Sequence, residues 1–119
     1  MSKEKEKHMK GKFEIFQSSA NNQYYFRLKA SNGEIILASE GYTTKSSCQG
    51  GIESVRKHSP DDDNYVRKDS TNGQYYFVLR AKNHEPIGHS EMYTTKASRD
   101  KGIESVKRFG PDADVVDLT

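Results

Sequence analysis

The sequence predicts an α+β domain in which two copies of one small unit share a single antiparallel sheet. The first observation is a repeat, because residues 23–30 and 74–81 carry nearly the same string 51 positions apart. The offset holds without a gap between residues 13–61 and 64–112, where roughly half of the aligned positions are identical. The second observation is a change of period within each copy, from the alternation typical of strands to the three-and-four spacing typical of a helix.

Each copy is too small to bury a comfortable core alone, since a unit of about fifty residues covers little of its own surface. The economical arrangement is one sheet made by both copies, with both helices on one face, the other face in solvent and an approximate twofold symmetry. We expect one domain with a disordered tail at residues 1–10, a first repeat at 11–61 and a second at 62–119. Because the second copy supplies the partner that a single unit would need, we expect a monomer.

Three strands open the first copy, at residues 11–17, 23–30 and 34–39. Alternation in the second of them predicts one buried face and one wet face. The side chains expected to point inward are Tyr24, Phe26, Leu28 and Ala30, and those expected to point outward are Tyr25, Arg27 and Lys29. An Asn-Gly pair at positions 32 and 33 predicts a hairpin turn before the third strand.

A helix follows the strands in each copy. Thr-Thr-Lys opens it at residues 43–45 and 94–96, with a threonine available as N-cap. The first helix is expected to run to about His58, and Gly110-Pro111 stops the second. The stripe expected to face the sheet is Ser47, Gly51, Ile52 and Val55 in one helix and Ser98, Gly102, Ile103, Val106 and Phe109 in the other.

The second copy repeats the strands at residues 64–69, 74–81 and 85–90, and a last short strand is expected at 114–118. Val66 is expected in the place of Ile15. Pro86 replaces Ile35, and a proline in a strand indicates a sheet edge or a strand start.

Composition limits the classes of function. Only 32% of the 119 residues are hydrophobic and there is no Trp, which predicts a thin core. The net charge of +2 is well short of the imbalance typical of a dedicated DNA-binding domain. The single cysteine, Cys48, excludes an internal disulfide, and no apolar run is long enough for a membrane span or a secretory signal. We therefore expect a soluble cytoplasmic protein.

The open face of the sheet is the first candidate site. The side chains expected there are Phe16, Tyr25, Arg27, Lys29, Tyr65, Arg67, Tyr76 and Arg80, joined by Lys12 and Glu14. Aromatic and basic residues interleaved on an exposed sheet are the ingredients of platforms for single-stranded nucleic acid. The alternative is ordinary cross-strand pairing on a solvated face, for which tyrosine, arginine and lysine are also suited.

The helix starts are the second candidate site. The residues concerned are Thr44, Lys45, Thr95 and Lys96. They place backbone N–H groups, hydroxyls and an ammonium together, as a phosphate-like anion would require. A lysine in the first turn opposes the helix dipole, and the alternative to an anion is a local contact with Glu40 or Glu91.

Gly51 and Gly102 lie in the middle of the helices, where each costs roughly 1 kcal/mol relative to alanine. Their presence in both copies predicts that something approaches the helix backbone closely. Packing against Tyr24 or Phe26 and their counterparts is one explanation, and a ligand or partner backbone is the other.

We expect no catalytic residue, no metal site and no cofactor. The histidines at positions 58, 84 and 89 have other residues at the equivalent positions of the repeat. Ser39-Glu40 and Ser90-Glu91 could imitate a nucleophile beside a carboxylate, but no paired histidine accompanies them. The sequence therefore favours a binding module over an enzyme.

The strings kept in both copies resemble a known family, the YegP family of small bacterial tandem-repeat proteins. The matching strings are Ser-Glu-x-Tyr-Thr-Thr-Lys at residues 39–45 and 90–96 and Gly-Ile-Glu-Ser-Val at residues 51–55 and 102–106. The resemblance covers nearly everything after Gly11. It implies units of three strands, a helix and a strand in one sheet, with the strands at 65–68 and 114–118 exchanged between units, and it implies no catalytic residues.

The leading hypothesis is a non-enzymatic module whose sheet face binds single-stranded nucleic acid or an acidic partner. It predicts salt-sensitive binding that Arg27→Ala, Arg80→Ala and Tyr25→Ala weaken. A small-anion or metabolite site at the helix starts is the alternative, and a purely structural or protein-interaction role is the third hypothesis.

Overall fold

The strands and helices follow one another in the predicted order. The computed structural model describes residues 10–119, so the tail predicted at residues 1–10 lies outside it except for Lys10. The elements are β1 (Lys12–Gln17), β2 (Tyr24–Lys29), β3 (Ile35–Ser39), α2 (Lys45–His58), the 3₁₀ turn η1 (Asp62–Asn64), β4 (Tyr65–Asp69), β5 (Tyr75–Arg80), β6 (Pro86–His89), α3 (Lys96–Phe109) and β7 (Asp114–Asp117).

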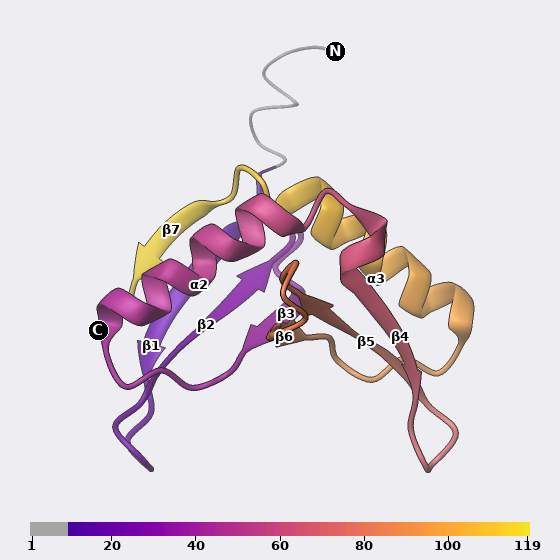
Figure 1. Ribbon diagram of the computed structural model, residues 1–119, viewed down its shortest axis with the longest axis horizontal. Coiled ribbons are helices and arrows are strands. Elements are labelled where there is room, and N and C mark those ends of the chain that lie inside the picture. The colour runs from indigo at the N-terminus through magenta and orange to yellow at the C-terminus, as the bar shows by residue number, and fades with distance from the viewer. Residues whose placement is uncertain (1–9) are drawn as a thin grey trace.

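All seven strands belong to one sheet, in the order β4-β5-β6-β3-β2-β1-β7. The two copies meet at the centre, where β3 pairs antiparallel with β6. In Figure 1 the strands β1 and β2 form one wing and β4 and β5 form the other, and the two wings slope away from the centre like the sides of an arch. The prediction of one sheet shared by two repeats is confirmed.

The core lies between the sheet and the two helices. Helix α2 packs against β2 and also against β5 and β6, whereas α3 packs against β5 and β3. The largest fully buried side chains are Phe13, Phe26, Phe77, Ile15, Leu28, Leu37, Ile52, Leu79, Ile103, Val55, Val106 and Cys48. Because each helix covers strands of both copies, the two repeats bury one common core, as predicted.

Local signals in the sequence also take the expected form. Thr44 and Thr95 cap the helices, and each hydroxyl accepts a hydrogen bond at 3.0 Å from the backbone N–H three residues further on. Gly33 has φ of +88° in the turn between β2 and β3, a conformation that glycine adopts without strain. Pro86 is the first residue of β6, which is one of the two positions that a proline in a sheet indicates.

The last strand gives one correction to the predicted antiparallel sheet. β7 pairs with β1 in parallel, with Lys12 opposite Asp114, whereas the other five strand pairs are antiparallel. The direction follows from where the chain leaves α3, because the Asp114 N–H already donates to the Gly11 carbonyl at the start of β1. The strand after each helix thus pairs with a strand of the opposite half. β7, which follows α3, pairs with β1, and β4, which follows α2, pairs with β5. This is the exchange that the family resemblance implies.

The first strands of the two copies do not align at the constant offset of 51. Leu28 and Leu79 are 51 positions apart, but their strand partners, Phe13 and Tyr65, are 52 apart. The difference arises in the loops, because six residues separate the paired ends of β1 and β2 but only five separate those of β4 and β5.

This shift moves every side chain of β4 to the face opposite the one predicted. Arg67, which pairs with Phe77, stands in the place of Ile15, which pairs with Phe26. The prediction that Val66 occupies that place is wrong, because a one-residue change of register reverses the faces of a strand.

Candidate functional site

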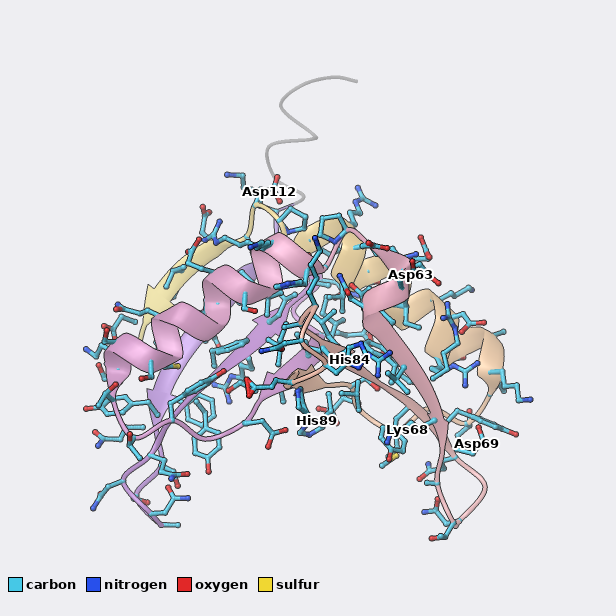
Figure 2. The ribbon with its side chains drawn as sticks, viewed as in Figure 1. Asp63, Lys68, Asp69, His84, His89 and Asp112 are labelled. Atoms are coloured by element: carbon cyan, nitrogen blue, oxygen red, sulfur yellow. The ribbon has the colours of Figure 1, made fainter. Side chains whose placement is uncertain are left out.

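The outer face is the side of the sheet away from α2 and α3. The strand register places on it Lys12, Glu14, Phe16, Tyr25, Arg27, Lys29, Val66, Lys68, Tyr76, Val78, Arg80 and His89. In Figure 2 the labelled Lys68 and His89 lie on the lower side of the ribbon, toward the opening of the arch. All five predicted binding residues of the sheet, Tyr25, Arg27, Lys29, Tyr76 and Arg80, lie on this face.

A stack of planar groups covers the first wing. Phe16 and Tyr25 are opposite each other across β1 and β2, with ring centroids 5.7 Å apart and ring planes at 17°. The Arg27 guanidinium lies over the Phe16 ring, 4.7 Å from its centroid. The Tyr25 hydroxyl accepts a hydrogen bond of 3.0 Å from the Asn21 side-chain amide. These cross-strand contacts hold the aromatic rings in place on the surface.

Glu14 neutralises part of the positive charge on this wing. Its carboxylate lies 2.8 Å from Arg27 Nε and 3.2 Å from Lys29 Nζ, and only 10% of its side chain is exposed. The hydrogen bond from Arg27 holds the pKa of Glu14 below its ordinary value, although burial acts in the opposite direction and Lys29 adds to the lowering. Two of the predicted binding cations, Arg27 and Lys29, are therefore already paired within the protein.

Two cations of the second wing have no ion-pair partner within residues 10–119. Lys68 lies opposite Tyr76 across β4 and β5, and Arg80 ends β5 on the same face. Neither Lys68 nor Arg80 makes an ion pair with any residue that the structure describes. Tyr76 is half-buried and Lys68 is exposed. This wing therefore offers a ligand an aromatic ring with one cation opposite it and a second cation further along the strand.

The difference in charge between the wings has a simple origin in the sequence. Val66 and Val78 lie opposite each other where the first wing has the pair Glu14 and Arg27. The second wing thus lacks the strand carboxylate that neutralises the cations of the first. This asymmetry could be found only after the register of β4 was known.

Tyr65 and Arg67 were predicted on the outer face and lie on the other side. Tyr65 is 6% exposed, its ring meets Phe77 edge-on at 5.7 Å, and its hydroxyl donates to the Ser59 carbonyl at 2.7 Å. Burial raises the pKa of Tyr65. Both corrections follow from the register shift, which turns the odd-numbered residues of β4 toward the helices.

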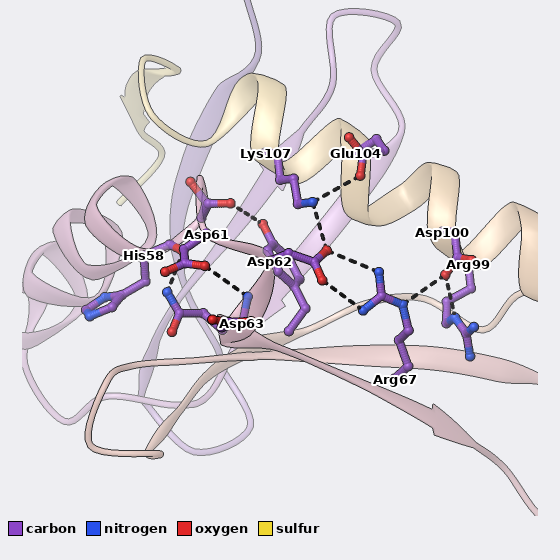
Figure 3. Close-up of polar contacts among 12 residues, drawn as sticks. His58, Asp61, Asp62, Asp63, Arg67, Arg99, Asp100, Glu104 and Lys107 are labelled. Atoms are coloured by element: carbon purple, nitrogen blue, oxygen red, sulfur yellow. Dashed lines mark hydrogen bonds and ion pairs between the residues drawn. The ribbon is translucent and has the colours of Figure 1, made fainter.

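Arg67 instead belongs to an ion-pair network along the edge of the second wing (Figure 3). Its Nε lies 3.2 Å from Asp100 Oδ1 on α3, and its Nη2 lies 3.2 Å from Asp62 Oδ1 in η1. Lys107 Nζ lies 2.8 Å from the same Asp62 oxygen and 3.1 Å from Glu104 Oε2. The network joins β4, η1 and α3, which indicates a structural role.

Asp62 at the centre of this network gives a pH-dependent prediction. Hydrogen bonds from Arg67 and Lys107 lower the pKa of Asp62 to about 2, against about 3.9 in an unfolded chain. Asp62 therefore stabilises the fold above pH ~4, and this contribution is lost as the pH falls toward 2. We expect Asp62→Asn to lower the free energy of unfolding by about 1 kcal/mol at pH 7, because the half-exposed carboxylate is screened by solvent.

Urea denaturation at a series of pH values measures the effect. The difference between wild type and Asp62→Asn should shrink to nothing between pH ~4 and ~2. Asp63→Asn is the matched control, because the neighbouring carboxylate makes no ion pair with the described residues. A difference that stayed constant down to pH ~2 would contradict this account.

The helix starts keep the predicted threonine caps, but their lysines have other neighbours than expected. The Lys45 ammonium lies 2.9 Å from Asp117 Oδ2 of β7, and the Lys96 ammonium lies 5.8 Å from the centroid of the Tyr75 ring. The expected contacts of these lysines with Glu40 and Glu91 do not form, because the fold brings other groups closer. The Thr44 and Thr95 hydroxyls accept the capping hydrogen bonds described above. The anion site proposed there stays a prediction.

Each mid-helix glycine leaves room for a tyrosine side chain to pack against the helix. A β-carbon on Gly51 would lie 2.8 Å from Tyr42 Cζ and 2.9 Å from Phe26 Cε2, and Gly102 faces Tyr93 in the same way. Packing, one of the two predicted explanations, therefore accounts for both glycines, and Phe26 was correctly expected. Tyr42 and Tyr93 were missed, although each precedes the Thr-Thr-Lys string in both copies.

The repeated Ser-Glu pairs are structural. The buried Ser39 hydroxyl accepts a hydrogen bond of 2.9 Å from the Phe26 N–H and donates to the Glu40 carbonyl at 2.8 Å. The Ser90 hydroxyl makes the equivalent bonds, at 3.0 Å and 2.7 Å. Because each hydroxyl is held between two backbone groups, it is not placed for nucleophilic attack.

Two features are absent from residues 10–119. No cluster of three or more His, Cys, Asp or Glu side chains in that part of the chain has an arrangement that could hold a metal ion. No helix formed by those residues combines the length and the apolar character needed to cross a membrane.

The fold and its two equivalent halves define a class of tandem-repeat α+β proteins. A family model described as "Domain of unknown function (DUF1508)" matches the chain twice, at residues 19–65 and 70–117. The UPF0339 protein in the ptx operon 5' region of Stutzerimonas stutzeri is 54% identical over 110 residues, which are 92% of this chain and 98% of the relative. YegP of Escherichia coli K12 is 51% identical over 111 residues, 93% of this chain and 100% of the relative.

Solved structures agree with this assignment. The solution NMR structure of YegP from E. coli, described as a protein of unknown function, matches with a TM-score of 0.87 and 51% identity over 93% of this chain and 95% of that one. The solution NMR structure of a UPF0339 protein from Shewanella oneidensis matches with a TM-score of 0.87 and 48% identity over 93% of each chain. The chain belongs to the UPF0339 family, which includes YegP, as its repeated strings predicted.

Proposed function

We propose that the outer face of the sheet binds single-stranded nucleic acid. The observation that carries the proposal is the second wing, where Lys68 lies opposite Tyr76, Arg80 ends the strand of Tyr76 on the same face, and neither cation has an ion-pair partner among the described residues. Cations that the protein does not neutralise are free to contact phosphates, and an aromatic ring offers a surface on which a base stacks.

The charge of the whole face supports the same ligand. Among the described strand residues, five cations face outward, namely Lys12, Arg27, Lys29, Lys68 and Arg80. The carboxylates on that face are Glu14 and Asp114. The outer face is therefore positive although the chain as a whole carries only +2. A polyanion is attracted to such a surface, and its affinity depends on salt.

The aromatic groups favour a nucleic acid over a simple acidic peptide. Phe16 and Tyr25 are stacked on the first wing, and Tyr76 lies at the position equivalent to Tyr25 on the second. Every base has a face that stacks on such rings, whereas a carboxylate side chain gains nothing from them. Binding without a sequence motif also fits the absence of an RNP-like string.

Fluorescence anisotropy with a labelled oligodeoxythymidylate of about 15 nucleotides, within the range that single-stranded platforms cover, tests the proposal. Affinity should fall as salt rises. Arg80→Ala should weaken binding several-fold and reduce the salt slope by about 0.7, the change expected for one phosphate contact. Tyr76→Ala should cost about 1–3 kcal/mol for one lost base stack. Arg27→Ala should cost less than Arg80→Ala, because Arg27 is already paired with Glu14.

Lys57→Ala is the matched control, since Lys57 is exposed on α2 and has no ion pair with the described residues. No binding at low salt, or an equal loss with Lys57→Ala and Arg80→Ala, would overturn the proposal. Equal binding of polyglutamate with no effect of Tyr76→Ala would mean an acidic protein partner instead. Inorganic phosphate that shifted the amides of Lys45 and Lys96, and not those of the sheet, would favour the small-anion hypothesis.

We further propose that the protein is a monomer and that it works in the cytoplasm. One core shared by both repeats leaves neither repeat in need of a second chain. Burial raises the pKa of Cys48 to about 11, so that this free thiol is unreactive in a reducing compartment.

A further inference from the structure

Two equivalent pockets lie at the seam between the repeats. The first, of about 440 Å³, is lined by Glu34 and Ile36 near the start of β3 and by Tyr93 and Ser105 of the other repeat. The second, of about 310 Å³, is lined by the counterparts of these residues, namely Glu85, Ile87, Tyr42 and Ser54. Each pocket therefore combines a hairpin of one repeat with a tyrosine and a helix of the other, and neither lies on the outer face.

Each pocket contains one tyrosine hydroxyl, that of Tyr93 in the first and that of Tyr42 in the second. Neither Tyr42 nor Tyr93 makes a side-chain hydrogen bond with any residue in the described range. Each ring nevertheless reaches its position only because a mid-helix glycine, Gly51 or Gly102, leaves room for it. A tyrosine hydroxyl thus lies at the same place in both copies, where it can form a hydrogen bond with a ligand.

Negative charge faces the Tyr93 hydroxyl in the first pocket. Burial raises the pKa of Tyr93, and the carboxylates of Glu34 and Glu91 add to the effect, so both act on the Tyr93 hydroxyl. Neither carboxylate makes an ion pair with the described residues, and the same is true of Glu85 in the second pocket. The first pocket also contains Lys101, which leaves two carboxylates against one ammonium.

We propose that both pockets bind small aliphatic amines, with the ammonium group held by a glutamate and the tyrosine hydroxyl. The glutamate is Glu34 in the first pocket and Glu85 in the second. Both are acceptors for an ammonium, whose three N–H groups need acceptors in directions that a carboxylate and a phenol oxygen supply. The neighbouring isoleucine contacts the carbon chain of the ligand.

The two pockets differ in lining but not in net charge. The first pocket is larger and has Glu91 and Lys101 in addition to Glu34, so its carboxylates exceed its ammonium by one. The second has Glu85 as the charged residue of its lining. We therefore expect two molecules of amine per chain, one in each pocket, with comparable affinities.

An NMR titration of the full chain with 1,4-diaminobutane tests this inference. Saturable shifts of the Gly102 and Tyr93 amides should report binding in the first pocket, and those of the Gly51 and Tyr42 amides should report binding in the second. Glu34→Gln should weaken binding at the Tyr93 pocket about tenfold or more, because it removes a charged hydrogen-bond acceptor. Tyr93→Phe should weaken it about two- to tenfold, because it removes a hydrogen-bond acceptor that carries no charge.

The second pocket supplies the control. Glu85→Gln should weaken binding at the Tyr42 pocket and leave the Tyr93 pocket as it was, and Glu34→Gln should do the reverse. Unchanged amide spectra outside the pocket show that a variant is folded. Equal losses in both pockets with either variant would mean unspecific charge attraction, and shifts that never saturate would mean no site. Either result would overturn the inference, whatever the outcome for the sheet face.

Discussion

Replacing Gly51 by alanine is expected to destabilise the protein by about 1–3 kcal/mol, whereas the same change at Gly50 is expected to stabilise it by roughly 0.5–1 kcal/mol. The two glycines are adjacent in α2 and gain the same helix propensity from a methyl group. Only the surroundings of the new β-carbon differ. Stability changes of opposite sign would therefore show that the packing of Tyr42, and not a property of the helix itself, decides the effect at Gly51.

The environments of the two positions decide the signs. A β-carbon on Gly50 meets nothing within 4 Å, and the equivalent position of α3 is occupied by Lys101. A β-carbon on Gly51 would lie within 3 Å of Tyr42 Cζ and of Phe26 Cε2. Phe26 is 1% exposed and packed in the core, so the overlap costs more than the propensity that is gained.

Urea denaturation of both variants beside wild type measures the two effects. Gly102→Ala should repeat the loss in α3, because its β-carbon would lie 2.8 Å from Tyr93 Cζ. If Gly51→Ala were as stable as Gly50→Ala, the ring of Tyr42 would not be fixed over α2. The pockets inferred at Tyr42 and Tyr93 would then lose their basis.

The sequence predicted the fold well wherever local signals and the repeat agree. Thr44 and Thr95 capped the helices as expected, and the alternation around Phe26 and Phe77 gave the correct buried face. The face of β4 was wrong because one residue is missing from the loop before β5. The repeat is strongest in β5 and weak in β4, so the aligned strings could not show the deletion, and Tyr65 was placed on the wrong side.

The candidate site was predicted in part. Alternation alone places Arg27, Lys29 and Arg80 outward, but it does not say which of them has a partner. Glu14 pairs with Arg27 because their positions are opposite in the register of β1 and β2, and register depends on the loop as well as on the strands. Tyr42 lies outside the regular strands, where periodicity carries no information.

The two edges of the sheet show how the protein uses its final strand. Edge strands expose unpaired backbone groups and are protected in natural proteins by charge or by cover. β4 ends in the exposed residues Arg67, Lys68 and Asp69, and Arg67 points inward as a charged residue. β1 instead carries Phe13 and Ile15, which are 0% exposed, and is covered by β7. The apolar strand thus receives the cover, and the charged strand remains at the edge.

A chain that ends at Ala113 is therefore expected to lose about 2–4 kcal/mol of its free energy of unfolding and to associate through β1. The loss combines the backbone hydrogen bonds of β7, at about 1 kcal/mol each, with the exposure of apolar residues on β1. It also removes the ion pair between Lys45 and Asp117.

A chain that ends at Asp117 keeps β7 and serves as the control. Urea denaturation and size-exclusion chromatography at several concentrations measure both effects. Equal stability of the two shortened chains, with both remaining monomeric, would show that β7 adds little and that β1 needs no cover.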